Sequence, residues 1–293
     1  MNTINGVVVG YDGSDAGVRA LDWAAAEAGA RGVPLTVVHV WELNVGSSMG
    51  MPVVDLRTVA QETLENGVGH LRETAPDLEV KPVLERGTPA ARLIEAGSHA
   101  DLIVVGSRGW GGFTGLMLGS VGAHLAAHAP CPVVVVRGEP EPEPAPEQGP
   151  ARVVVGVDGS PGSRAALALA FTEADAHGAP LTVLVAWEDA RPDDLPPLVD
   201  AEGLREAAET RLEQLLIPGR ERHPAVDVRT QVVEGAPREV LMRASSGARL
   251  LVVGSRGLGG VRGLLLGSVG HALVHHALCP VAIFHAHERA AGT

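Results

Sequence analysis

The chain carries one sequence unit twice, and this duplication limits its possible folds more than any other feature. The pattern Gly-Ser-Arg-Gly, nine residues, Gly-Ser spans residues 106–120 and recurs at 254–268. Residues 106–136 and 254–284 align without gaps and are identical at 19 of 31 positions. The sequence therefore predicts two similar domains in tandem.

The domain boundaries follow from this repeat and from the different composition of the segment that joins the two halves. A chain of 293 residues suits two domains of ordinary size, each with its own apolar core. We expect domains at 1–137 and 151–286, with a tail at 287–293. The intervening segment 138–150 is rich in Glu and Pro, which favours an extended, semi-rigid spacer.

Composition excludes several classes of partner. The formal net charge of −12 and the pI near 5.4 argue against nucleic acid, which requires a concentrated positive surface. An aromatic content of 3% leaves few rings for stacking on bases. No apolar run approaches the roughly 20 residues that cross a bilayer, and Met1 leads into a strand instead of a signal peptide. We therefore expect a cytoplasmic protein without membrane contact.

Apolar runs alternate with helical patterns in both halves. In the first half we expect strands at 7–10, 35–40, 78–84, 101–105 and 132–136, and helices at 14–30, 56–74 and from Pro89. In the second half we expect strands at 152–156, 181–186, 226–233, 249–253 and 280–284, and helices from Ser160, around 201–216 and from Pro237. This alternation predicts an α/β fold with two tandem five-stranded parallel sheets, each covered by helices on both faces.

The glycine motif lies where open α/β sheets bind ligands, at the carboxyl end of the fourth strand. Gly106 and Gly109 leave space for a ribose and phosphates, Ser120 is expected to cap a helix whose dipole favours anions, and Arg108 adds a cation. The same roles are expected of Gly254, Gly257, Ser268 and Arg256. Alternatively, the glycines only mark turns and the serines are ordinary caps. Neither copy has the Lys-Ser/Thr ending of a P-loop or a GxGxxG fingerprint.

Two further pairs of residues are expected at the same edge of each sheet. Asp12 and Asp158 follow the first strands and can meet a ribose, an adenine amino group or a phosphate-bound magnesium ion, or serve only as turn residues. Val40 and Ala186 end the second strands. Their backbone groups can meet an adenine edge, or the residues can simply pack in the core.

Histidines and acids give no catalytic arrangement. His124 and His128 are four residues apart on one predicted helix, and His271, His275 and His276 lie on its counterpart. Such spacing can hold a metal, but no further ligand follows at a fitting distance, and we expect surface or interface histidines. No residue is placed as a base for hydrolysis of a bound polyphosphate, so catalysis is not expected.

Both halves resemble universal stress protein domains, and the chain resembles the tandem type found in actinobacteria. The resemblance rests on the Asp after the first strand and on the complete glycine motif. It implies an adenine nucleotide alpha hydrolase-like fold and two sites for ATP with Mg²⁺. The implied first site comprises Asp12, Val40, Gly106, Arg108, Gly109, Gly119, Ser120 and Val121. The implied second site comprises Asp158, Ala186, Gly254, Arg256, Gly257, Gly267, Ser268 and Val269. Ala186 is smaller than the aliphatic residue usual there.

Three functions remain as hypotheses. The first is a cytoplasmic stress-response protein whose occupancy by ATP alters conformation or partner binding, with the loops 110–118 and 258–266 ordering over the phosphates. The second is a slow ATPase or an autophosphorylating enzyme, and the third is a scaffold without nucleotide. We also expect the last strands, 133–136 and 281–284, to pair the two domains with each other or with those of a second chain as a homodimer.

Overall fold

A computed structural model describes residues 5–42, 53–109, 118–137, 151–187, 201–258 and 266–285. The chain divides into two compact units, Met1–Arg137 and Gly138–Thr293. The predicted linker 138–150, the tail 287–293 and nearly all of the two loops expected over the phosphates lie outside the described residues.

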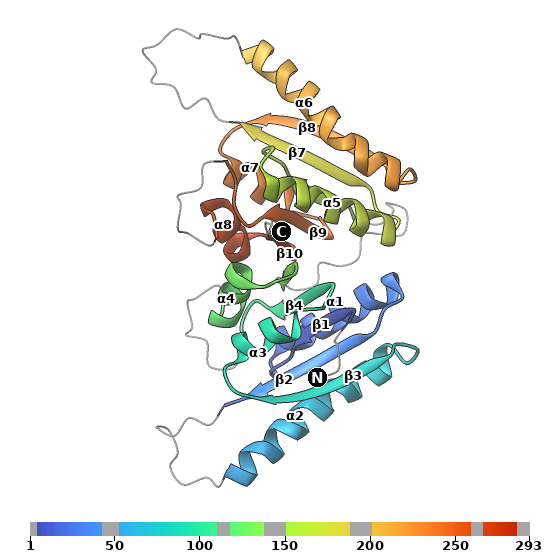
Figure 1. Ribbon diagram of the computed structural model, residues 1–293, viewed down its shortest axis with the longest axis vertical. Coiled ribbons are helices and arrows are strands. Elements are labelled where there is room, and N and C mark those ends of the chain that lie inside the picture. The colour runs from blue at the N-terminus through green and yellow to red at the C-terminus, as the bar shows by residue number, and fades with distance from the viewer. Residues whose placement is uncertain are drawn as a thin grey trace, which may run out of the picture. The chain divides into compact units, whose positions relative to one another are not determined.

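The first unit is a parallel sheet with the strand order β3-β2-β1-β4-β5 (Figure 1). Its strands pair in parallel along the whole series, with Val7 opposite Leu35 on one side and Leu102 on the other. Its elements are β1 (Val7–Gly10), α1 (Asp15–Arg31), β2 (Leu35–Trp41), α2 (Val53–Thr74), β3 (Val80–Arg86), α3 (Pro89–Ala96), β4 (Leu102–Gly106), α4 (Ser120–His128) and β5 (Val133–Val136).

The second unit repeats this order as β10-β9-β6-β7-β8, again with parallel pairs (Figure 1). Its elements are β6 (Val153–Gly156), α5 (Pro161–Ala176), β7 (Leu181–Trp187), α6 (Ala201–Arg222), β8 (Val228–Glu234), α7 (Pro237–Ala244), β9 (Leu250–Gly254), α8 (Ser268–His276) and β10 (Val281–Phe284).

Local sequence explains why these elements form. The central strands are short runs of Val, Leu and Ile whose side chains are buried, as expected for a sheet covered on both faces. Ser14 and Ser160 cap α1 and α5 through their hydroxyl oxygens, which accept hydrogen bonds from the N–H groups of Gly17 and Ser163. Gly32 ends α1 in the left-handed conformation.

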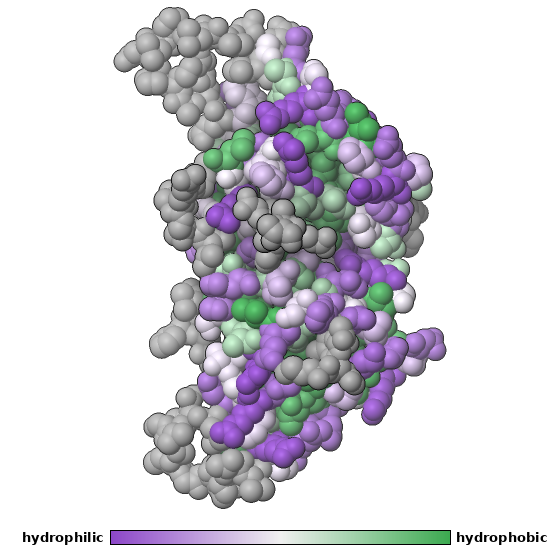
Figure 2. Space-filling model, in the orientation of Figure 1, coloured by the Kyte–Doolittle hydropathy of each residue, from purple (hydrophilic) through white to green (hydrophobic). Residues whose placement is uncertain are grey.

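Helices cover both faces of each sheet. In the first unit α1 packs against β1 and β4, while α3 packs against α4 and β2. Two glycines permit this close approach: a Cβ atom at Gly106 would lie 2.6 Å from the carbonyl oxygen of Ala16 on α1, and one at Gly10 would lie 2.8 Å from Leu93 on α3. Hydrophilic residues dominate the visible surface over α6 and much of that over α2 (Figure 2). No helix of the described chain is long and apolar enough to cross a membrane.

The predicted element types are confirmed, and most boundaries differ by one or two residues. The largest difference is α6, which was expected to stop at 216 but continues to Arg222 through Pro218. Leu212 and Leu216 are buried, and Gly219 lies against the Phe171 ring, so packing holds the last turn despite the proline. The pairing of domains or chains through β5 and β10 stays a prediction.

Candidate functional site

Each unit has a cavity where the carboxyl ends of its strands meet. Cavity 1, in the first unit, has a volume of about 430 Å³, and cavity 2, in the second, about 440 Å³. All eight residues predicted for the first site line cavity 1: Asp12, Val40, Gly106, Arg108, Gly109, Gly119, Ser120 and Val121. All eight predicted for the second line cavity 2: Asp158, Ala186, Gly254, Arg256, Gly257, Gly267, Ser268 and Val269.

The aspartate after the first strand belongs to a tight turn in both units. The turn needs glycine at its second position, because Gly13 and Gly159 both have φ of 84°. Asp12 Oδ1 accepts hydrogen bonds from Ser14 N at 3.0 Å and from Ser14 Oγ at 2.6 Å. The turn role expected as the alternative for this residue is therefore present, together with a position on the cavity wall.

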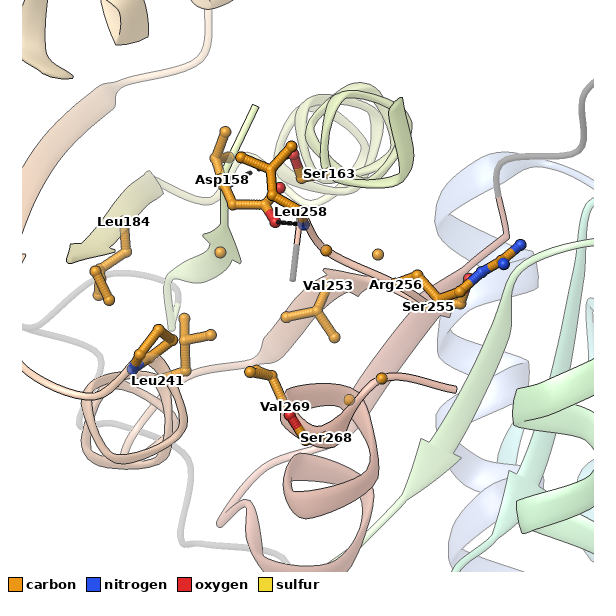
Figure 3. A pocket seen from close by; sticks show the side chains of 18 residues that line it. Asp158, Ser163, Leu184, Leu241, Val253, Ser255, Arg256, Leu258, Ser268 and Val269 are labelled. Carbon is orange, nitrogen blue, oxygen red and sulfur yellow. Dashed lines mark hydrogen bonds between the residues drawn. The ribbon is translucent and has the colours of Figure 1, made fainter. Parts of the chain in front are cut away.

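Asp158 also connects its turn to the glycine loop of cavity 2 (Figure 3). Its Oδ1 accepts a hydrogen bond from Ser160 N at 2.9 Å, and its Oδ2 accepts one from Leu258 N at 2.8 Å. Burial alone would raise the pKa of Asp158, but hydrogen bonds from Ser160, Leu258 and Ser163 outweigh it and hold the pKa below its ordinary value. Asp158 is thus stabilised as an anion, and it is hydrogen-bonded to the backbone N–H of Leu258, the residue after Gly257.

Glycine is required at different positions of the motif for different structural reasons. Gly106 was expected to leave space for a ligand, but the space beside it is occupied by α1, and at Gly254 by the backbone of Gly162 and Ser163. Gly109 and Gly257 adjoin the aspartates: a Cβ atom at either would overlap the carboxylate of Asp12 or Asp158. Neither Gly109 nor Gly257 has a positive φ, so an unusual backbone angle is not the reason for these glycines.

A backbone hydrogen bond joins the two ends of the nine-residue loop in each copy of the motif. The N–H of Gly119 donates to the Ser107 carbonyl at 2.8 Å, and Gly267 donates to Ser255 at 2.7 Å, so each loop returns to its own start. The prediction that Ser120 caps its helix is wrong.

The actual N-caps are Gly119 and Gly267, neither of which can provide a side-chain cap, and Ser120 and Ser268 are the first helical residues. The first turns of α4 and α8 therefore face the cavities without a capping side chain.

The arginine of the motif lies at the rim of each site. Arg108 and Arg256 are exposed. The side chain of Arg256 extends away from the space between Val253 and Val269 (Figure 3). Its guanidinium is therefore not directed into cavity 2, in contrast to the expected role as a cation over the phosphates.

Sequence reasoning missed an apolar wall that comes from other elements. Val38, Leu93 and Val105 line cavity 1 beside the predicted Val40, and Leu184, Leu241 and Val253 line cavity 2. The signal was available in Thr88-Pro89 and Leu93, because a proline at the start of a helix places the residue four positions later on the same face. This wall makes one end of each cavity apolar.

The two cavities also differ at several lining positions. Tyr11, Gly17 and His39 line cavity 1, whereas Val157 and Ser163 replace the first two in cavity 2. Ser163 Oγ accepts a hydrogen bond from Gly159 N at 3.1 Å and donates to the Ser160 carbonyl at 3.1 Å, which ties the turn of Asp158 to α5. His39 Nδ1 lies 2.8 Å from the Tyr11 carbonyl oxygen.

Known proteins share this organisation over almost the whole chain. The model of the universal stress protein family matches residues 4–137 and 150–285. Universal stress protein Rv2005c of Mycobacterium tuberculosis is 39% identical over 287 residues, which cover 95% of this chain and 96% of that protein. Universal stress protein Rv2623 of the same organism is 36% identical over 293 residues, covering 96% and 97%.

A solved structure supports the fold. The crystal structure of a universal stress protein from Archaeoglobus fulgidus DSM 4304 superposes with a TM-score of 0.68 at 20% identity, covering 96% of each chain. The predicted α/β fold and the predicted family resemblance are both confirmed. The chain belongs to the universal stress protein family, with two domains of that family in tandem.

Proposed function

We propose that the chain binds ATP with Mg²⁺ in both cavities and that occupancy by nucleotide regulates a stress response. One observation carries the proposal. Two cavities of nearly equal volume each combine an apolar wall, a helix start without a side-chain cap and a carboxylate. Volumes of 430 and 440 Å³ fall within the range of small-molecule sites.

The distribution of groups within each cavity fits the two ends of a nucleotide. In cavity 1 the wall of Val38, Val40 and Leu93 suits an apolar, planar base. At the other end, the first turn of α4 offers backbone N–H groups and the positive end of the helix dipole, which favour phosphate. We therefore assign the base to the wall and the phosphates to Gly109, Gly119 and Ser120.

The carboxylate supplies the remaining chemistry. Mg²⁺ binds through one or two carboxylates together with phosphate oxygens, and Asp12 or Asp158 provides such an oxygen. In the second unit the Asp158 carboxylate accepts the Leu258 N–H. A phosphate-bound metal ion at this carboxylate would compete with that bond. Binding would therefore weaken the hydrogen bond that holds Leu258, and in this way occupancy would change the conformation of the loop that begins there.

The competing hypotheses make different predictions for the same experiment. A slow ATPase or autophosphorylating enzyme requires product formation that depends on Mg²⁺, and a scaffold requires that nucleotide does not bind. Under our proposal ATP and a non-hydrolysable analogue act alike, because differential affinity and not chemistry shifts the conformational population.

Calorimetry with ATP and Mg²⁺ tests the proposal, and we expect two equivalents bound per chain. Gly109→Val or Gly257→Val should each remove one equivalent, because the side chain displaces the neighbouring aspartate and fills the phosphate end. Gly69→Val is the matched control, since a Cβ atom there meets nothing within 4 Å. Two equivalents retained by the double variant, with circular dichroism confirming its fold, contradict the proposal.

A further inference from the structure

Two arginines converge on the turn at the rim of cavity 2. Arg164, in the first turn of α5, donates a hydrogen bond from Nε to the Gly159 carbonyl at 3.2 Å. Arg211 of α6 approaches the same glycine, since a Cβ atom at Gly159 would lie 3.3 Å from its Nη2. Both side chains are exposed. Gly159 of the turn is therefore close to two cations.

Neither arginine has an acidic partner among the described residues. The positions three and four residues from Arg211 on α6 are Ala207, Ala208, Gln214 and Leu215. Those around Arg164 are Ser160, Pro161, Leu167 and Ala168.

Two other arginines of α6 are paired. Arg205 Nε lies 2.9 Å from Glu209 Oε1, and Arg220 Nη1 lies 2.6 Å from Glu213 Oε2. The chain has a net charge of −12, and Arg164 and Arg211 both approach Gly159 without an ion pair to an acid among the described residues.

The first unit lacks this pair at the corresponding turn. Val18 and Thr63 occupy the positions equivalent to Arg164 and Arg211 in the repeat. The first turn of α1 contains Asp15, whereas the first turn of α5 contains no acid. The helix that follows this turn thus begins with an acid in its first turn in the first unit and with an arginine in the second, and the chain provides its own comparison.

The turn adjoins the part of cavity 2 assigned to phosphate. Asp158 precedes Gly159 and lines the cavity, and its Oδ2 accepts the N–H of Leu258, the residue after Gly257. Guanidinium groups bind phosphate oxygens through paired, charge-assisted hydrogen bonds. We propose that Arg164 and Arg211 form a phosphate-binding site at the rim of cavity 2 that cavity 1 does not have.

The phosphate has two chemical sources. It is either the terminal phosphate of a nucleotide in cavity 2, in which case the inference rests on the proposed function, or a separate phosphate anion. The arginine pair has the same chemistry in both cases. Pyrophosphate and ATP, used as separate probes of the full chain, distinguish them.

Calorimetric titrations of pyrophosphate at low ionic strength test the site. Arg164→Gln and Arg211→Gln should each weaken binding roughly tenfold, the scale of one lost charge-assisted hydrogen bond. Arg205→Gln removes the same charge from the same helix at an ion-paired position and should leave the affinity within about twofold. In the other direction, Val18→Arg with Thr63→Arg should add a second pyrophosphate site in the first unit.

ATP titrations are run in a Gly109→Val chain, whose remaining nucleotide site is cavity 2. Weakening of both probes by Arg211→Gln supports the terminal phosphate, and weakening of pyrophosphate alone supports a separate anion. Equal affinities in the wild type, Arg164→Gln and Arg211→Gln chains for both probes overturn the inference. Pyrophosphate binding that needs both arginines, in a wild-type chain that does not bind ATP, contradicts the proposed function but supports the anion site.

Discussion

At the scale of single residues, the glycines of the repeated motif are not interchangeable. Gly106 and Gly254 allow a helix backbone to touch a strand, whereas Gly109 and Gly257 allow a carboxylate to touch a loop. Gly119 has more room, because a Cβ atom there would lie 3.7 Å from the Ser107 carbonyl oxygen, and its φ of −73° suits any residue. The glycines of the motif therefore meet different packing requirements.

This difference predicts unequal losses of stability. Gly106→Ala should lower the free energy of unfolding by about 1–3 kcal/mol, because the added methyl group must displace the Ala16 backbone. Gly119→Ala should cost less than about 1 kcal/mol, since only a preference at the N-cap is lost. Urea unfolding of the two variants without nucleotide measures the difference. Equal losses would show that packing against α1 is not what Gly106 provides.

The predicted site residues line the two cavities, but the sequence did not give the orientation of each group. Motif spacing and the family resemblance together named eight residues for each cavity, and all of them lie at the carboxyl edge of a parallel sheet or on the helix start beside it. The direction of Arg256 could not be predicted, since a long exposed side chain has many rotamers of similar energy. Ser120 was assigned as the cap although glycine, with no side-chain oxygen, takes that position.

At the scale of elements, the second helix of each unit docks through a glycine that admits an aromatic ring. On α2, a Cβ atom at Gly67 would lie 2.6 Å from the Tyr11 ring, and on α6 one at Gly219 would overlap the Phe171 ring. The repeat places Ala25 at the position of Phe171 and Leu71 at that of Gly219, and both are buried. The larger side chain of this pair is therefore Leu71 on α2 in the first unit and Phe171 on α5 in the second.

This exchange predicts energetic coupling between Gly219 and Phe171. Gly219→Leu should destabilise the second unit because the new side chain overlaps the ring, and Phe171→Ala should cost about 3–5 kcal/mol through the space that it leaves. The double variant should be more stable than the sum of the two losses indicates, by about 1–3 kcal/mol. Urea unfolding of all four chains gives the coupling free energy, with Gly69→Leu as the control. Additive losses would contradict the packing.

Element types were predictable because buried strands and capped helices leave strong local patterns. The end of α6 was not predictable, since the local sequence Pro218-Gly219 is typical of a helix terminus. Contacts with a distant residue, Phe171, decide that boundary. Such contacts join segments far apart in the sequence, and periodicity alone does not contain them.

At the scale of the whole molecule, duplication has produced two sites of similar size but different detail. The wall residue Val40 of cavity 1 is Ala186 in cavity 2, and Gly17 is replaced by Ser163. The volumes differ by only about 10 Å³. Similar space with different chemistry predicts that both sites accept one class of ligand and that their affinities differ.

If each cavity binds nucleotide, each domain should gain stability from its own ligand. At a free concentration of 100 times the dissociation constant, this gain is about 2.7 kcal/mol per site. Trp187 is the only tryptophan of the second unit, and Trp23, Trp41 and Trp110 lie in the first. A chain in which those three are replaced by Phe therefore reports the unfolding of the second unit through fluorescence.

In that chain, ATP with Mg²⁺ should raise the urea midpoint of the Trp187 signal. Gly257→Val should abolish the shift, because it blocks the cavity that Ala186 and its neighbours line in the same unit as the probe. Gly109→Val should leave the shift intact, since its effect belongs to the first unit. A Trp187 midpoint that still rises with ATP in Gly257→Val would mean instead that the two domains unfold as one cooperative body, because nucleotide in the first cavity would then stabilise the second domain as well.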